Sequence, residues 1–467
     1  MYKDSLVRVN SVVALGFGVL CFTSSCFAQT DWPYIDPTEV SDSEAAVLVP
    51  QDSPTEGGMS PNDFDPVPLT GSGSYFPTAH TGMTLDEILD MAVRQSPELA
   101  VERAKVGESR MRALTIGLPP NPNIVGGAKK VSGGDTGPVF AIKQELPVSG
   151  ARGLRRKAAT IAYSADQTEF LRTTQEVLHK VQSAYVEVLG ASEKVGLESK
   201  NLRITQNSLD LASRRFKAGK DPELTVAFAK AEFATARSSS HIAGKELKVA
   251  RDNLAGILGI SQSDLPPVVG NLNDSFIPDD LTPDGYTRPD LQAAQLRTQA
   301  KGAEVRAAER SRLPNPVLGY SREEAGKDTE NFFTLGFEIP LWDSGDSRVR
   351  ERRASQQTAR AEQQAHQVRV ATEVEVARDK LWEWRKEVQI HKQDILPAVQ
   401  EALSLSENAH KSGQADPQVL LQTQSRLLEL ERNATRALIS LRNAELEYLL
   451  ALGFPKNLRL TAGGSRY

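Results

Sequence analysis

Residues 150–219 read GARGLRRKAATIAYSADQTEFLRTTQEVLHKVQSAYVEVLGASEKVGLESKNLRITQNSLDLASRRFKAG, and this stretch decides the fold. Apolar residues recur at every seventh position of its second half: Val181, Val188, Val195, Leu202, Leu209 and Phe216. This spacing is typical of a helix that packs on neighbouring helices as in a coiled coil. No proline interrupts it, and about 65 residues would give a helix of roughly 100 Å. The sequence therefore predicts a protein built around a helical rod.

Composition supports long helices rather than one large core. The chain has 467 residues, of which 39% are hydrophobic and 6% aromatic, and its formal net charge is −5. A net negative charge gives no reason to expect nucleic-acid binding. No stretch after residue 28 reaches about 18 apolar residues, so we expect no membrane-spanning helix there. A membrane crossing would have to use strands in a closed barrel.

The first 28 residues resemble an export signal. Lys3 and Arg8 precede a short apolar run at residues 11–22, and small residues precede a cleavage site after Ala28. Thr23-Ser-Ser-Cys26 partly matches a lipoprotein box, so lipidation at Cys26 is the alternative. Both cysteines lie in this segment, and cleavage after Ala28 would leave no cysteine for a disulfide or a thiolate metal site.

Residues 29–82 form an acidic segment rich in Pro, Ser and Gly. It carries nine acidic residues and no Lys or Arg, a composition that predicts disorder.

Order is expected over residues 83–260. A first helix should begin after Thr84, which can form a capping box with Glu87. A second helix should begin at Pro97, with Ser96 as its N-cap. A hairpin follows at 123–146, then the long helix at 150–218, a turn at Gly219 and a returning helix at 223–258. The returning helix has a seven-residue seam of Val226, Phe233, Leu247 and Leu254, which Ser240 interrupts.

The pattern then starts again. After a connector at 261–287, residues 288–454 contain a helix, a hairpin at 317–340, a long helix at 344–412 and a helix at 417–452, and a tail at 455–467 follows. Landmarks of different kinds, Pro120 and Pro314, Pro147 and Pro340, Gly219 and Gly413, and Gly259 and Gly453, are each 193 or 194 residues apart. This constant offset predicts a tandem repeat. Pro397 lies inside the second long helix and predicts a local kink.

The strands predict an oligomer. Residues alternate between apolar and polar, which places Phe140 and Ile142, and Phe333, Leu335, Phe337 and Ile339, on lipid-facing sides. Four strands are too few to enclose a channel, so several copies would each contribute strands to one barrel. Phe332 and Trp342 suit the aromatic girdles of such a barrel, although Trp342 also suits ordinary packing at a strand end.

The ordered set of short motifs resembles the outer membrane efflux (TolC-like) proteins over about residues 83–455. The motifs are Leu85-Asp-Glu-Ile-Leu, Pro97-Glu-Leu, two Pro-Asn-Pro entries, Glu145-Leu-Pro and Glu338-Ile-Pro, the two glycine turns, and Leu-Gly pairs at 258–259 and 452–453. The resemblance implies a homotrimer with a 12-stranded barrel and a 12-helix tunnel. Its partners would be a periplasmic adaptor and an inner-membrane pump of the RND type. The start of the long helix, Gly150-Ala-Arg-Gly-Leu-Arg-Arg156, is most similar to the heavy-metal branch.

In this family the two turns form the closed periplasmic tip and meet the adaptor. The resemblance therefore assigns the tip and gate to residues around them: Phe216, Lys217, Gly219, Asp221, Glu223, Lys411, Gly413 and Asp416. Val419 and Gln422 stand where some relatives have acidic rings, which leaves Asp221, Glu223 and Asp416 as substitute constriction residues. Helix capping is the other interpretation of Asp221 and Asp416, because each precedes a proline.

The sequence contains no motif typical of an enzyme: it has no nucleophile elbow, phosphate loop or zinc-protease signature. The histidines are scattered, so neither a metal site nor a cofactor is expected. The predicted function is a passive efflux duct in the outer membrane, in contact with its lipid and extending into the periplasm, with divalent heavy metals as the cargo. A drug or secretion duct is the alternative, and a periplasmic coiled-coil adaptor without a pore is the second.

Overall fold

The computed structural model describes residues 82–130, 136–277, 288–325, 328–337, 344–412 and 417–453, together with Trp342 and Gln414. All of them belong to one compact unit, Pro77–Tyr467. The expected signal with Ala28 and Cys26, the acidic segment up to residue 81 and the tail from residue 455 lie outside the described residues, as do Ile339, Gly413 and Asp416.

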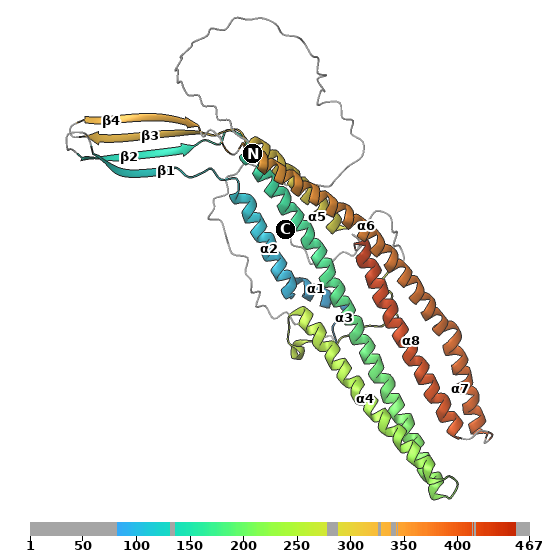
Figure 1. Cartoon of the computed structure of the whole chain (residues 1–467). Helices are drawn as coiled ribbons and strands as arrows, with labels where there is room; N and C mark the ends of the chain where they lie inside the picture. The colour runs from blue at the N-terminus through green and yellow to red at the C-terminus, as the bar shows by residue number, and fades with distance from the viewer. Residues whose placement is uncertain are drawn as a thin grey trace, which may run out of the picture. The chain divides into compact units, whose positions relative to one another are not determined.

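The first half begins with α1 (Leu85–Gln95) and α2 (Pro97–Thr115). The backbone N–H and side chain of Thr84 contact Glu87 Oε2 at 2.9 and 3.1 Å, so the expected capping box is present. Strands β1 (Asn123–Lys130) and β2 (Thr136–Glu145) follow. The long helix is α3 (Ala151–Lys217), and α4 (Glu223–Leu258) returns along it (Figure 1).

The connector carries a short 3₁₀ helix, Gln262–Asp264, before the second half starts with α5 (Pro289–Arg310). Strands β3 (Pro316–Ala325) and β4 (Asp328–Phe337) come next. The following helices are α6 (Asp346–Ile390), a π-helical turn at His391–Ile395, α7 (Leu396–Lys411) and α8 (Pro417–Leu452).

The π-helical turn is the kink expected near Pro397. Proline lacks an N–H, and its ring clashes with the carbonyl four residues earlier, here that of Gln393. The helix widens by one residue in the turn before the proline, as π-bulges do. The single helix predicted at 344–412 is therefore divided into α6 and α7.

The four strands form one antiparallel sheet in the order β1-β2-β3-β4. The two hairpins join through β2 and β3, where Ile142 is paired with Tyr320. The helices pack in a row, with α2 and α5 against α3, and α6 against α5. Farther along the chain, α4 and α8 also pack against α3, and α6 and α7 pack against α8 (Figure 1).

The core lies where α1, α3, α4, α6 and α8 meet, and its fully buried side chains include Ile88, Val181, Leu254 and Leu446. The predicted α3 seam is buried at Val181 and Val188 but becomes exposed toward its end, where Phe216 is 43% exposed.

The predicted α4 seam is one of two adjoining rows on the packed face of that helix. Val226, Phe233 and Leu247 are only half-buried, and only Leu254 is fully buried. The buried positions spaced by seven are alanines, Ala229, Ala236, Ala243 and Ala250. The alanine row lies three residues from the predicted row, so the two rows adjoin on one helix face. The small alanine side chains let the backbones of α3 and α4 approach closely.

Candidate functional site

The turn between α3 and α4 is built around Gly219. The C-terminal end of α3 needs a residue with positive φ to satisfy its last carbonyls, and Gly219 has a φ of +70°. Its N–H donates to Phe216 O at 2.9 Å, and the next N–H, of Lys220, donates to Arg215 O at 2.9 Å. The chain can therefore reverse within a few residues and begin α4.

Arg215 and Asp221 lock this turn. Arg215 Nε donates to Asp221 Oδ2 at 2.8 Å, and its Nη2 donates to Oδ1 at 3.1 Å. These hydrogen bonds lower the pKa of the Asp221 carboxyl. The carboxylate is held by Arg215 and makes no capping bond at the start of α4, so the capping interpretation is wrong for Asp221. The sequence signal was an arginine six residues before an aspartate, across a glycine.

The structure describes some of the other residues predicted at the tip. Phe216, Lys217 and Glu223 are exposed. Lys411 is the last residue of α7, and the N–H of Gln414 donates to Ala409 O at 2.8 Å. The seven-residue seam did not point to Leu224 and Phe228, an i, i+4 apolar pair that is 62% and 63% exposed beside the turn.

The sheet has one apolar face. Strand register places five of the predicted lipid-facing residues on it: Phe140, Ile142, Phe333, Leu335 and Phe337. Phe333 is 86% exposed and contacts the Tyr320 ring with centroids 5.2 Å apart. Leu318, opposite Leu335, and Ile124, opposite Ile142, extend the same face.

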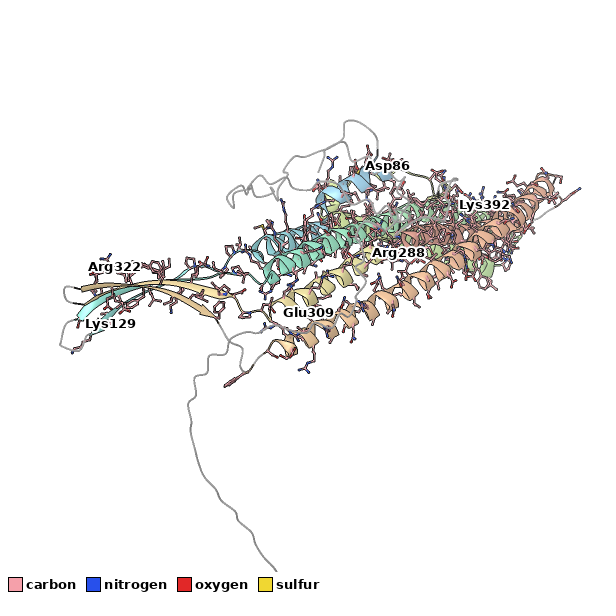
Figure 2. The ribbon with its side chains drawn as sticks, turned by 90° about the horizontal axis from the view of Figure 1, so that it is seen from above. Asp86, Lys129, Arg288, Glu309, Arg322 and Lys392 are labelled. Carbon is pink, nitrogen blue, oxygen red and sulfur yellow. The ribbon has the colours of Figure 1, made fainter. Side chains whose placement is uncertain are left out.

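The opposite face is polar. It carries Lys143, Ser321 and Thr334, and an ion pair in which Lys129 Nζ lies 2.5 Å from Glu323 Oε2. Figure 2 labels Lys129 on this face and also Arg322, which is paired with Phe140 and so belongs to the other face.

The two predicted girdle residues, Phe332 and Trp342, lie in different surroundings. Phe332 is opposite Ser321 in the register and so lies on the polar face, which argues against a girdle role for it. A girdle residue has to point toward lipid, and alternation along β4 turns residue 332 away from the side of Phe333. Trp342, after β4, is 86% exposed.

Among the described residues, no helix is both long enough and apolar enough to cross a membrane. That same part of the chain holds no group of three or more His, Cys, Asp or Glu side chains arranged for a metal ion.

Comparisons with known proteins agree with this arrangement. The pyoverdine export outer membrane protein OpmQ of Pseudomonas putida is 24% identical over 412 residues, covering 79% of this chain and 85% of OpmQ. The cobalt-zinc-cadmium resistance protein CzcC of Cupriavidus metallidurans is 22% identical, covering 79% of this chain and 91% of CzcC. A crystal structure of CusC superimposes with a TM-score of 0.68 at 18% identity, over 82% of this chain and 96% of CusC.

Family membership rests on a broader match. Residues 89–260 and 286–453 both match the model of one family, described as outer membrane efflux protein. These two segments contain both helical hairpins and the whole sheet. The chain belongs to the outer membrane efflux protein family, whose members are transport channels of the outer membrane that extend into the periplasm.

Proposed function

We propose that this chain is the passive exit duct of a tripartite efflux system, assembled as a homotrimer. Each protomer contributes its four strands to a shared 12-stranded barrel and its long helices to a tunnel in the periplasm. A periplasmic adaptor and an inner-membrane pump of the RND type supply the cargo. Support for a tandem repeat comes from the two family matches and from the constant sequence offset.

The sheet carries this proposal. Phe333, Leu335 and Phe337 are exposed at 86%, 62% and 58% on one face, while the other face is polar. A sheet with these exposed side chains needs an apolar surrounding on one side and water on the other. The wall of a membrane barrel provides both, with lipid outside and a polar lumen inside.

The tip of the duct would be formed by the α3/α4 turn and by the corresponding turn after α7. The exposed Phe216, Leu224 and Phe228 would meet the adaptor there. Asp221 is neutralised by Arg215, so Glu223 and Asp416 remain the proposed acidic residues of the constriction.

For cargo we propose divalent heavy metals, on the strength of CzcC, which is named for resistance to such metals. OpmQ covers the same share of this chain and is named for pyoverdine export, so export of small organic molecules is the second candidate. Sensitivity of a deletion strain to Zn²⁺, Co²⁺ and Cd²⁺ but not to organic compounds would support the first candidate.

Adjacent residues of β4 provide a matched test of the barrel. Leu335→Lys would place a charge on the apolar face, and Thr334→Lys would place the same charge on the polar face. A lysine facing lipid near the middle of the bilayer costs about 2–4 kcal/mol in each protomer. We expect Leu335→Lys to abolish the heat-modifiable oligomer in outer-membrane fractions and Thr334→Lys to retain it. Equal recovery of both variants would contradict the barrel.

A further inference from the structure

A cavity of about 520 Å³ lies among the four helix ends that adjoin the strands in the chain. Its lining comes from the end of α2, the start of α3, the end of α5 and the start of α6. Glu309, labelled near the end of α5 in Figure 2, marks this region. The cavity therefore lies next to the sheet, at the entrance to the proposed barrel.

The cavity occupies one side of the helix row. Arg155, Ala158, Ala159 and Ala162 line it and have the i, i+3, i+4, i+7 spacing of one helix face. Because α2 and α5 flank α3, and α6 follows α5, a single cavity that touches all four helices must lie on a concave side of that row. Lys157 lies on the other side of α3 by the same spacing.

The lining is strongly cationic. Five side chains carry positive charge, and Glu304 is the single carboxylate among the described residues that line the cavity; the cations are Arg112, Arg155, Lys301, Arg348 and Arg352. Glu304 is already shared, since Lys301 Nζ lies 3.1 Å and Arg352 Nη1 3.2 Å from its two oxygens.

Two more arginines of the lining, Arg112 and Arg155, lie outside the pairs made by Glu304. Arg112 pairs with Glu108, which is outside the lining, at 2.7 Å. Arg155 has no carboxylate at ion-pair distance within the described part of the chain. Alanines 158, 159, 162, 307 and 308 form the apolar remainder of the wall. The cavity thus combines excess positive charge with a surface that can contact a hydrocarbon or aromatic skeleton.

The next ionic contacts between α3 and α5 have a different charge composition. Farther along α3, Asp166 and Glu169 lie 3.9 and 3.7 Å from the two terminal nitrogens of Arg297 on α5. Two carboxylates face one arginine there, whereas the lining of the cavity near the sheet has five cationic side chains and one carboxylate.

We propose that this cavity is a passage site for anionic cargo, namely small molecules that carry carboxylate or phosphate groups, including metal ions held as anionic chelates. The inference rests on the proposed function, in which the concave side of the helix row faces the lumen of the duct. A ring of arginine and lysine side chains favours anions in a pore, and it repels a free divalent cation. A heavy metal would pass here in chelated form.

Binding of a fluorescent anion to the purified full-length oligomer tests the site directly. The probe is 8-hydroxypyrene-1,3,6-trisulfonate, followed by fluorescence anisotropy at low salt. Replacing a cation by an anion a few ångströms from a bound charge in a hydrated cavity should weaken binding roughly five- to tenfold. We expect that loss for Arg155→Glu and less than a twofold change for Lys157→Glu. Equal effects of the two substitutions, or none, would overturn the proposal.

Complementation of a deletion strain separates this inference from the function on which it rests. If the wild-type chain restores resistance to no compound, the duct itself is refuted. If wild type restores resistance and Arg155→Glu loses it for anionic compounds alone, with Lys157→Glu unaffected, the passage site is supported. Equal export of anionic and cationic compounds by Arg155→Glu overturns the site and leaves the duct standing.

A lipid phosphate could use the same cations, and mass spectrometry of the purified oligomer distinguishes that source. Phosphatidylglycerol retained by wild type and Lys157→Glu but lost from Arg155→Glu would assign the cavity to lipid and overturn the cargo proposal. Equal lipid content in all three proteins supports it.

Discussion

Arg288 should be one of the most sensitive positions in the helical part of the protein. Its side chain, labelled in Figure 2, is 4% exposed. It donates to both oxygens of Asp290 at 3.0 and 2.6 Å, to Glu373 at 2.7 Å and to the carbonyl of Ala451 at 3.3 Å. Arg288 thus joins the start of α5 to α6 and to the last turn of α8, where helix carbonyls lack intrahelical donors.

The pKa shifts of Asp290 and Arg288 show that each side chain favours the charged form of the other. Burial alone would raise the pKa of Asp290, but the Arg288 guanidinium outweighs burial and lowers the pKa of that carboxyl. Burial opposes the charge of Arg288 as well, but the hydrogen bonds that Arg288 donates to Asp290 and Glu373 outweigh it and raise the pKa of the guanidinium. Arg288 is therefore the main group that keeps Asp290 charged, beside Arg172 at 3.8 Å and His366 at 3.1 Å.

Arg288→Met leaves Asp290 as a buried carboxylate without its main partner. Removing one member of a buried ion pair costs about 3–5 kcal/mol, and that is the expected loss in the free energy of unfolding. Urea unfolding followed by circular dichroism measures it, with all variants at one protomer concentration because oligomer stability depends on concentration.

The matched control is Arg353→Met. Arg353 is 61% exposed and contacts Glu309 at 2.7 Å, and an exposed pair contributes about 0–1 kcal/mol. Asp290→Leu added to Arg288→Met should recover much of the loss, because it removes the stranded charge. Losses of equal size for Arg288→Met and Arg353→Met would refute the reasoning.

Two further predictions concern the long helix and its turn. Because Arg215 lowers the pKa of Asp221, the turn is stabilised above the unfolded-state pKa of the carboxyl and loses that stabilisation as pH falls through the folded-state pKa. The protection of the turn amides from hydrogen exchange, relative to unstructured peptide at the same pH, should therefore fall on acidification in wild type, and Asp221→Asn should show low protection at every pH. Within α3, Gly196→Ala meets no atom within 4 Å, whereas a Cβ at Gly190 would lie 2.3 Å from Ile439 Cδ1. Gly196→Ala should therefore stabilise by about 0.5–1 kcal/mol and Gly190→Ala should not, and equal thermal midpoints for the two variants would contradict this packing.

Local chemistry made many elements predictable. Gly219 and Gly259 end helices with positive φ, prolines open others, and period-two alternation marks the strands. The predicted long helix at 150–218 corresponds to Ala151–Lys217 in the structure. Such signals depend on neighbours within about one turn of the chain, so the sequence contains them directly.

The predictions that failed involve choices between partners. Periodicity indicated one seven-residue row on α4, and it missed the adjoining row of Ala229 and Ala236, which the packing of α3 buries more fully. The sequence suggested either a constriction role or a helix-capping role for Asp221. The structure shows a third role, because Asp221 pairs with Arg215 across the turn. The β3–β4 register places Phe332 on the polar face of the sheet, which argues against the predicted girdle role.

The sequence by itself determined the order of helices and strands and the two apolar–polar alternations, because backbone conformation and side-chain period are local properties. Only the tertiary structure decided which buried charges meet and that β2 pairs with β3. It alone brought arginines and lysines from four helices to one cavity. The β2–β3 pairs join residues more than a hundred positions apart, and Arg288 and Glu373 are 85 apart. The energies of such contacts depend on distance and burial, which no spacing along the chain records.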